Sequence, residues 1–286
     1  MQYRRLGDSD LEVSEISLGS WLTFGVGVEA QAARACLDAA FDVGINFIDT
    51  ANVYGRGAAE TFLGEALKGR PRDSFVLATK LFFPMSATDQ GLSRGQVEKQ
   101  LDASLARLKT DVIDIMQIHF GPDPQKVLDD GECVRAMKDA REAGEIKYLG
   151  SSTSGDVLKR CIDSGDFQVV QVGYSLLHQD DGELISRARD KGIGVLVRSG
   201  FAGGWLTSRL TSAPREKRPP RAQALLHLCN GDTDKLYSLA LHFLARHNGI
   251  SSILVGTKSV KNLKQAMKRI VDQRDDALLD RAIKTS

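Results

Sequence analysis

The sequence contains little cysteine and no motif that pairs cysteines or ligates a metal. Its four cysteines are scattered without a C-x-x-C pair or regular spacing, at Cys36, Cys133, Cys161 and Cys229. This pattern is typical of reduced thiols in a cytosolic protein and argues against a disulfide framework. His242 and His247 are five residues apart, which does not align them on one helix face. We therefore predict no metal site.

Long apolar runs and a dominant charge are lacking as well. No run approaches the roughly 18 apolar residues of a membrane-spanning helix, and the N-terminal residues are polar and charged, unlike a secretory leader. The 38 Lys and Arg residues nearly balance the 37 Asp and Glu residues, so the total charge does not favour nucleic acid or an anionic membrane as a partner. These absences predict a cytoplasmic protein without membrane insertion. They leave its oligomeric state open.

What the chain contains instead is a repeated alternation of strand-like and helix-like segments. Apolar runs typical of buried parallel strands are expected at residues 15–20, 45–51, 75–81, 112–120, 148–152, 167–174, 194–199 and 250–256. Helical patterns follow them at residues 29–43, 58–68, 94–108, 131–143, 156–164, 183–191, 233–246 and 260–270. After a short N-terminal hairpin, eight such units without a break predict the α/β class, as one (β/α)8 TIM barrel domain over residues 1–286.

One stretch interrupts this alternation. Residues 200–232 separate the seventh strand from its helix and contain three prolines and a basic cluster, Pro214, Pro219, Pro220, Arg215, Lys217, Arg218 and Arg221. The sequence predicts a long loop here. A loop of this length is either functional or disordered, and a solvated surface excursion is the alternative reading of the charge cluster.

Four reactive side chains follow the predicted strand ends. Asp49 and Tyr54 lie at and beyond the end of the second strand, Lys80 near the end of the third and His119 near the end of the fourth. Each could instead have an ordinary structural role. An aspartate often caps a turn or helix, a histidine often lies in the core with its hydrogen bonds made, and a tyrosine often packs against neighbouring side chains. Lys80 stands out because an ammonium in an apolar run needs a partner, and Asp49 is the obvious one.

Together these four side chains have the composition of a proton-transfer site. A charged Lys80 beside Tyr54 favours the tyrosinate form, which makes the phenol a better proton donor near neutral pH. His119 would orient a substrate oxygen or share the proton, and the two groups together would polarise a carbonyl. The set lacks a source of hydride.

The motifs that carry these residues resemble those of the aldo-keto reductase family. They are Asp49-Thr50-Ala51-Asn52-Val53-Tyr54-Gly55, Lys80-Leu81 and Gln117-Ile118-His119-Phe120. The segment Leu18-Gly19-Ser20-Trp21-Leu22-Thr23-Phe24-Gly25 is similar to the branch that includes bacterial aldo-keto reductases and the potassium-channel beta subunits. The resemblance implies a barrel that binds a nicotinamide cofactor across its mouth and a small-molecule carbonyl substrate. It also implies that Tyr54 is the general acid, that Lys80 and Asp49 tune it, and that His119 orients the substrate.

The same resemblance implies a set of cofactor contacts. These are Ser20, Trp21, Asp49, Ser152, Thr153, Gln171, Arg198, Ser199, Gly200, Phe201, Gly256, Lys258, Ser259, Asn262, Lys264 and Gln265. The start of the last helix suits a phosphate. The resemblance implies that the 2′-phosphate of the cofactor is bound there, which favours NADPH/NADP+ over NADH. Thr153, Gly200 and Gln265 depart from the residues usual in the family, and Arg198 stands where a ring often stacks.

Three functions compete at this point. The main hypothesis is an NADPH-dependent reductase of aldehydes or ketones. The second is a slow-turnover NADPH-sensing regulatory subunit, akin to the channel-associated branch. The third is an aldolase that forms a Schiff base on Lys80, since barrels support that chemistry too.

Overall fold

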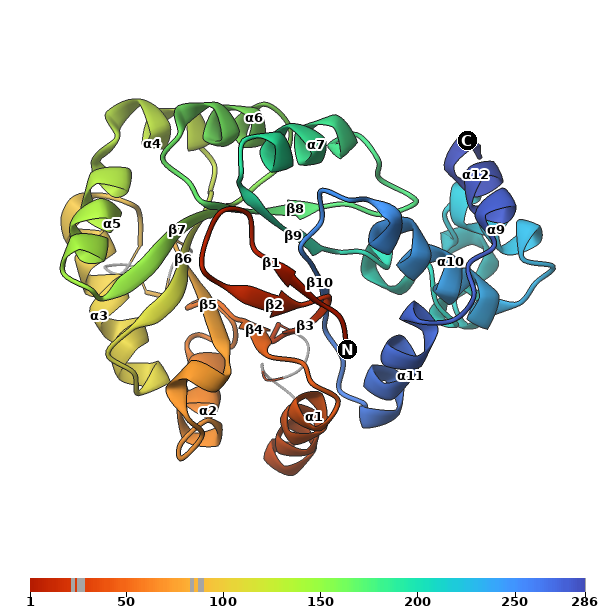
Figure 1. Cartoon of the computed structure of the whole chain (residues 1–286), viewed down its shortest axis with the longest axis horizontal. Helices are drawn as coiled ribbons and strands as arrows, with labels where there is room; N and C mark the ends of the chain where they lie inside the picture. Colours follow the sequence, from red (N-terminus) through yellow and green to blue (C-terminus); the bar gives the residue numbers. More distant parts are fainter. Residues whose placement is uncertain (22–23, 25–28, 83–84, 87–89, 286) are drawn as a thin grey trace.

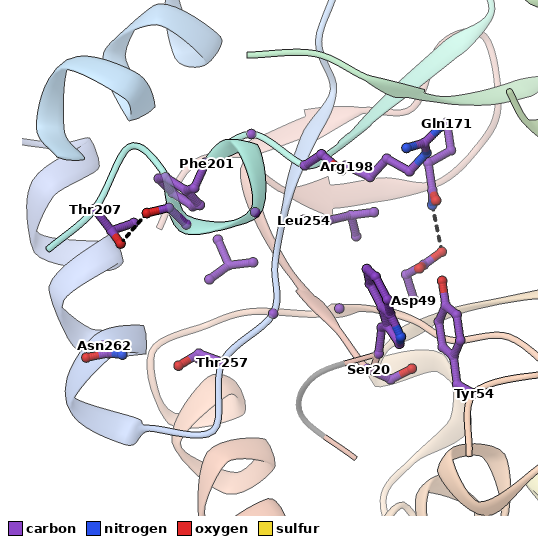
Figure 2. Close-up of a pocket in the computed structure, with 18 of the residues that line it drawn as sticks. Ser20, Asp49, Tyr54, Gln171, Arg198, Phe201, Thr207, Leu254, Thr257 and Asn262 are labelled. Carbon is purple, nitrogen blue, oxygen red and sulfur yellow. Dashed lines mark hydrogen bonds between the residues drawn. The ribbon is translucent and has the colours of Figure 1, made fainter. Parts of the chain in front are cut away.

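The protein folds as a closed barrel of eight parallel strands, which confirms the predicted (β/α)8 architecture (Figure 1). The computed structural model describes residues 1–21, 24, 29–82, 85–86 and 90–285. The barrel strands are β3 (Ile16–Gly19), β4 (Phe47–Asp49), β5 (Val76–Leu81), β6 (Ile113–His119), β7 (Ile146–Ser152), β8 (Val169–Gly173), β9 (Gly194–Arg198) and β10 (Ser252–Val255). Strand β10 pairs with both β9 and β3 and so closes the barrel. The carboxyl ends of the strands face a cavity (Figure 2).

A ring of helices covers the outside of the barrel (Figure 1). The eight predicted helices are present as α1 (Ala30–Asp42), α2 (Ala58–Ala66), α3 (Arg94–Leu108), α5 (Glu132–Glu142), α6 (Gly155–Ser164), α7 (Gly182–Asp190), α10 (Thr233–Arg246) and α11 (Val260–Ile270). Each buries one stripe, as α1 does with Ala33, Leu37 and Ala40 at helical spacing. Among the described residues, no helix has the length and apolarity to cross a bilayer.

The stretch predicted as a long loop contains helices instead. Residues 200–232 hold the turns η2 (Ala202–Gly204) and η3 (Arg215–Lys217) and the helices α8 (Arg209–Ser212) and α9 (Pro220–Leu228). Helix α9 buries Ala222 and Leu225, so the expectation of an irregular loop is corrected. In the sequence the prolines indicate irregular structure, because proline breaks a helix interior. Pro220 lies at the start of α9, where proline is well tolerated.

Three further elements were not predicted. They are the single turn η1 (Arg72–Ser74) and the helices α4 (Pro124–Asp130) and α12 (Asp276–Lys284). Helix α12 packs beside α9 and α10. The basic cluster of the 200–232 stretch partly serves this packing, because Arg221 donates to the carbonyl oxygens of Leu177 and Ile283.

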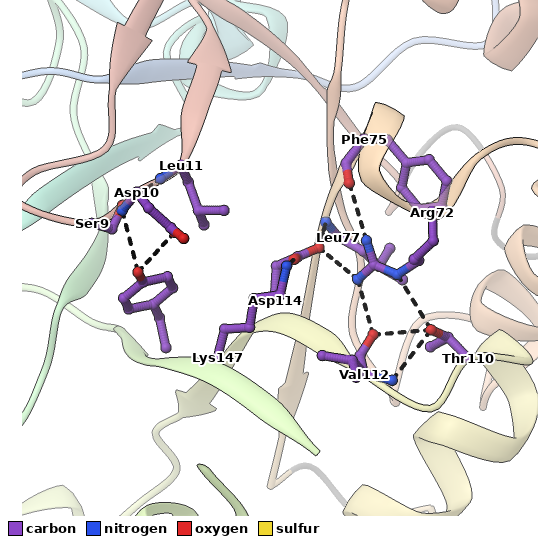
Figure 3. A network of polar contacts seen from close by, with 11 residues as sticks. Ser9, Asp10, Leu11, Arg72, Phe75, Leu77, Thr110, Val112, Asp114 and Lys147 are labelled. Atoms are coloured by element: carbon purple, nitrogen blue, oxygen red, sulfur yellow. Dashed lines mark hydrogen bonds and ion pairs between the residues drawn. The ribbon is translucent and has the colours of Figure 1, made fainter. Parts of the chain in front are cut away.

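The amino ends of the strands are closed by the predicted hairpin. Strands β1 (Tyr3–Arg5) and β2 (Glu12–Ser14) pair antiparallel, and Leu6, Leu11 and Val13 pack on side chains from the strand starts. Beside it, the buried Asp114 carboxylate contacts Arg72 at 2.6 Å and Lys147 at 2.7 Å (Figure 3). This end of the barrel is therefore filled and paired, which leaves the carboxyl ends of the strands for the site.

Helices α2 and α3 approach so closely that a glycine is required between them. A Cβ added at Gly64 would lie 2.2 Å from the backbone oxygen of Arg107, whereas one added at Gly95 would meet nothing within 4 Å. We expect Gly64→Ala to lower the free energy of unfolding by about 3 kcal/mol, because a backbone oxygen cannot swing aside. Gly95→Ala, the matched control, should gain up to about 1 kcal/mol. Urea unfolding that gives the two variants equal stability would contradict this packing.

Candidate active site

The predicted ion pair between Asp49 and Lys80 lies at the centre of the site. Lys80 Nζ donates to Asp49 Oδ2 at 2.5 Å and to the backbone oxygen of Thr50 at 2.8 Å, and the lysine is fully buried. The other carboxylate oxygen, Oδ1, accepts from Gln117 Nε2 at 3.0 Å and from Gln171 Nε2 at 2.8 Å. Both charges are thus held by several hydrogen bonds, as buried charges must be.

These partners keep Lys80 protonated. Burial by itself lowers the pKa of the Lys80 ammonium, but attraction to Asp49 and Tyr54 outweighs burial and raises the pKa above its ordinary value. Lys80 Nζ also donates to the Tyr54 hydroxyl at 3.4 Å. A permanent positive charge therefore lies in direct contact with the phenol.

Tyr54 is placed by the turn that follows β4. Its amide donates to the backbone oxygen of Ala51, and Gly57, at φ +88°, starts helix α2 in a conformation that favours glycine. The Tyr54 ring stacks on Trp21 at 6.3 Å and meets the His119 ring edge-on at 6.4 Å. Trp21 itself is 68% exposed at the rim of the cavity. The structure thus brings together all four predicted catalytic side chains.

His119 is the last residue of β6, and its ring is held neutral. Burial and the positive charges of Lys80 and Arg198 lower the pKa of His119 from 6.5 to about 3. A neutral ring has one N–H group, which donates a hydrogen bond but does not release its proton near neutral pH. Of the two roles predicted for His119, this charge state favours orienting an oxygen over sharing the proton.

The depressed pKa of His119 predicts a loss of stability in acid. Below the ordinary pKa, the unfolded chain binds a proton at this residue and the folded chain does not. The stability that neutral His119 contributes above about pH 6.5 is therefore lost as the pH falls towards 3. Between about pH 6.5 and pH 5 the wild type should lose about 1–2 kcal/mol more than His119→Gln. Urea unfolding at both pH values measures this, with the exposed His227→Gln as control. Equal losses in wild type and His119→Gln would contradict it.

A cavity of about 1200 Å³ runs from these residues along the mouth of the barrel. Most of the predicted cofactor contacts line it: Ser20, Trp21, Asp49, Ser152, Thr153, Gln171, Arg198, Ser199, Gly200, Phe201, Gly256, Asn262 and Gln265. Lys80 lies beneath its floor. Lys258, Ser259 and Lys264 are not among its lining residues, and the two lysine side chains are exposed at the start of α11. Figure 2 shows Tyr54 and Gln171 at one end and Asn262 at the other.

Ser259 has a structural role at this far end. Its hydroxyl oxygen accepts from the Asn262 amide at 3.4 Å and so caps helix α11, while its own amide donates to Thr257 Oγ1 at 3.1 Å. The sequence predicted a phosphate contact for this hydroxyl without recognising the cap.

The family of the chain follows from comparison with known proteins. Residues 15–281 match the model of the Aldo/keto reductase family. The chain belongs to this family. It is an oxidoreductase family, and membership implies a nicotinamide cofactor. The predicted resemblance is therefore confirmed over nearly the whole chain.

Individual relatives agree with this assignment. A probable voltage-gated potassium channel subunit beta from Oryza sativa subsp. japonica is 30% identical, over 94% of this chain and 91% of its own. The uncharacterized oxidoreductase YqkF of Bacillus subtilis is 27% identical, over 93% of this chain and 90% of its own. The holo form of aldo-keto reductase AKR11C1 from Bacillus halodurans superposes with a TM-score of 0.87 and 28% identity, covering 100% of this chain and 97% of its own.

Several residues that line the cavity were not predicted from the sequence. They are Val53, Thr207, Ser208, Arg209, Thr233, Asp234, Tyr237 and Leu254. Tyr237 stacks on Phe201 at 4.5 Å, and Asp234 accepts from Gln265 at 2.9 Å. Gln117, which holds Asp49, lies within a motif that the sequence identified, so its signal was present. No sequence signal marked Tyr237 on helix α10 as a lining residue, because an aromatic side chain on an amphipathic helix usually belongs to the core.

Proposed function

We propose that this protein reduces aldehyde or ketone carbonyls to alcohols with NADPH, with Tyr54 as the general acid. One observation carries the proposal: the Tyr54 hydroxyl lies in the wall of a large cavity and contacts a buried ammonium that Asp49 keeps charged. A small-molecule carbonyl compound is the substrate class that such a proton donor serves.

The cavity fits a dinucleotide. Its volume of about 1200 Å³ spans the barrel mouth from Tyr54 to the start of α11, a helix N-terminus that suits a phosphate. Near Tyr54 the Gln171 amide has a fixed orientation, because its Nε2 donates to Asp49 while its Oε1 accepts from Ser152 Oγ at 3.3 Å. That Oε1 is thereby presented as an acceptor for a carboxamide. When bound, the nicotinamide supplies the hydride for the carbonyl carbon.

The residues of the chain deliver a proton to the carbonyl oxygen. The carbonyl oxygen accepts the hydroxyl proton of Tyr54 as negative charge develops on it, and Lys80 stabilises the tyrosinate that remains. Asp49 maintains the charge of Lys80. The neutral ring of His119 donates a hydrogen bond to the same oxygen, and solvent returns a proton to Tyr54.

A preference for NADPH over NADH is part of the proposal. Lys258, just before α11, and Lys264, in its second turn, expose two positive charges near the cavity residue Asn262. Such charges, together with the helix dipole, favour a ribose that carries an additional phosphate.

The proposal is tested by following the oxidation of NADPH and of NADH with a panel of aldehydes, ketones and sugars, alongside a titration of nucleotide binding. We expect NADPH to bind and to be consumed with at least one aldehyde. Failure of the wild-type protein to bind either nucleotide would contradict cofactor use. Binding without consumption on any carbonyl would contradict the reductase.

The channel-subunit relative motivates a second candidate, a slow-turnover NADPH sensor that regulates a partner. It differs from the enzyme in its kinetics. One rapid oxidation of bound NADPH, followed by release of NADP+ too slow for further turnovers, would favour the sensor. Steady consumption at ordinary rates would exclude it.

A further inference from the structure

The guanidinium of Arg198 lies at the catalytic end of the cavity in an unusual position. Arg198 ends β9, directly beside Gly173 at the end of β8. A Cβ added at Gly173 would lie 3.1 Å from Arg198 Nη1, so the glycine leaves the space that the guanidinium fills. Figure 2 shows the side chain extended across the strand ends towards Gln171. The sequence thus places a cation, instead of a ring, on this part of the floor.

Among the residues that the structure describes, no ion pair neutralises the charge of Arg198. In the part of the chain that the structure describes, the carboxylates that line the cavity have other partners: Asp49 pairs with Lys80 and Asp234 with Arg269. Burial lowers the pKa of the Arg198 guanidinium below its ordinary value, and attraction to Tyr54, Asp181 and Asp49 offsets this only in part. The catalytic end of the cavity therefore carries a surplus positive charge in a partly buried setting, where charges act strongly.

The reacting ring of the cofactor must lie close to this charge. Hydride transfer needs the reacting atoms roughly 3–3.5 Å apart, and in the proposed function the carbonyl oxygen is bound by Tyr54. The ring is thus confined to the floor near Tyr54, which Ser152, Gln171 and Arg198 supply from β7, β8 and β9.

We propose that Arg198 makes this site select the reduced, neutral dihydronicotinamide over the oxidised, cationic nicotinamide. The inference rests on the proposed function and adds redox-state selectivity to it. A fixed cation repels the oxidised ring and leaves the reduced ring unaffected, since only the oxidised ring carries a positive charge. The consequence is tighter binding of NADPH than of NADP+, so that the oxidised cofactor leaves the site readily after each hydride transfer.

The test is the ratio of two dissociation constants, Kd for NADP+ over Kd for NADPH, measured by isothermal titration without substrate. In Arg198→Gln, which keeps polar donors but no charge, we expect this ratio to fall about tenfold, because a partly buried cation would no longer repel the oxidised ring. In Arg198→Lys, the charge-preserving control, the ratio should stay near wild type even if both affinities weaken. Thermal unfolding checks that both variants are folded.

The outcomes separate this inference from the proposed function. A ratio unchanged in Arg198→Gln, with both affinities altered equally, would reduce Arg198 to a packing contact and overturn the inference alone. A ratio that falls equally in Arg198→Lys would assign the effect to shape and also overturn it. Wild-type protein that binds neither nucleotide would overturn both.

Discussion

Replacing Tyr54 by phenylalanine is expected to lower kcat for carbonyl reduction about a thousandfold or more, the range of a lost general acid. The variant removes one oxygen, which receives the hydrogen bond of Lys80 at 3.4 Å, and keeps the ring that stacks on Trp21. Nucleotide affinity should stay close to wild type, because the polar groups proposed to hold the cofactor are untouched. Initial rates of NADPH consumption and a binding titration measure the two quantities separately.

Tyr148→Phe is the matched control for this variant. The Tyr148 hydroxyl donates to Asp10 at 2.8 Å, near the amino end of β7 and away from the site. Its removal should leave kcat unchanged and cost about 1 kcal/mol of stability. A Tyr54→Phe protein that kept the wild-type rate on every reducible aldehyde would show that the proton comes from another group.

The catalytic group was predictable because barrel topology converts sequence order into proximity. Asp49 and Lys80 are 31 residues apart, yet each lies near the carboxyl end of its strand, and β4 and β5 pair directly. An apolar run that contains a lysine demands a buried partner, and the neighbouring strand end supplied one. Fold and ion pair therefore followed from the same strand assignment.

The walls of the cavity were less predictable, because they depend on how helices pack on the finished barrel. Tyr237 faces Phe201 only because α10 docks against the 200–232 stretch, and no local pattern encodes that docking. The hydroxyl of Ser259 could serve either a ligand or its own helix, and only the fold shows the cap. Likewise the sequence located Arg198 without showing that the nearby carboxylates already have partners.

Lys80→Met is expected to reduce both stability and activity. The substitution leaves the Asp49 carboxylate buried without its cation, and breaking a buried pair in this way costs about 3–5 kcal/mol. Two amide donors from Gln117 and Gln171 remain on Asp49 Oδ1, so the variant should still fold. The rate should fall by about a hundredfold or more, because no ammonium is left beside Tyr54 to stabilise the tyrosinate. Urea unfolding and initial rates measure the two effects.

The double variant Asp49→Asn/Lys80→Met separates these two effects. An asparagine oxygen still accepts from Gln117 and Gln171, and no uncompensated charge remains, so most of the lost stability should return. The activity should not return, because the positive charge next to Tyr54 is still missing. A double variant as unstable as Lys80→Met would assign the loss to packing of the lysine chain. Recovery of the rate would show that Tyr54 donates its proton without help from a neighbouring ammonium.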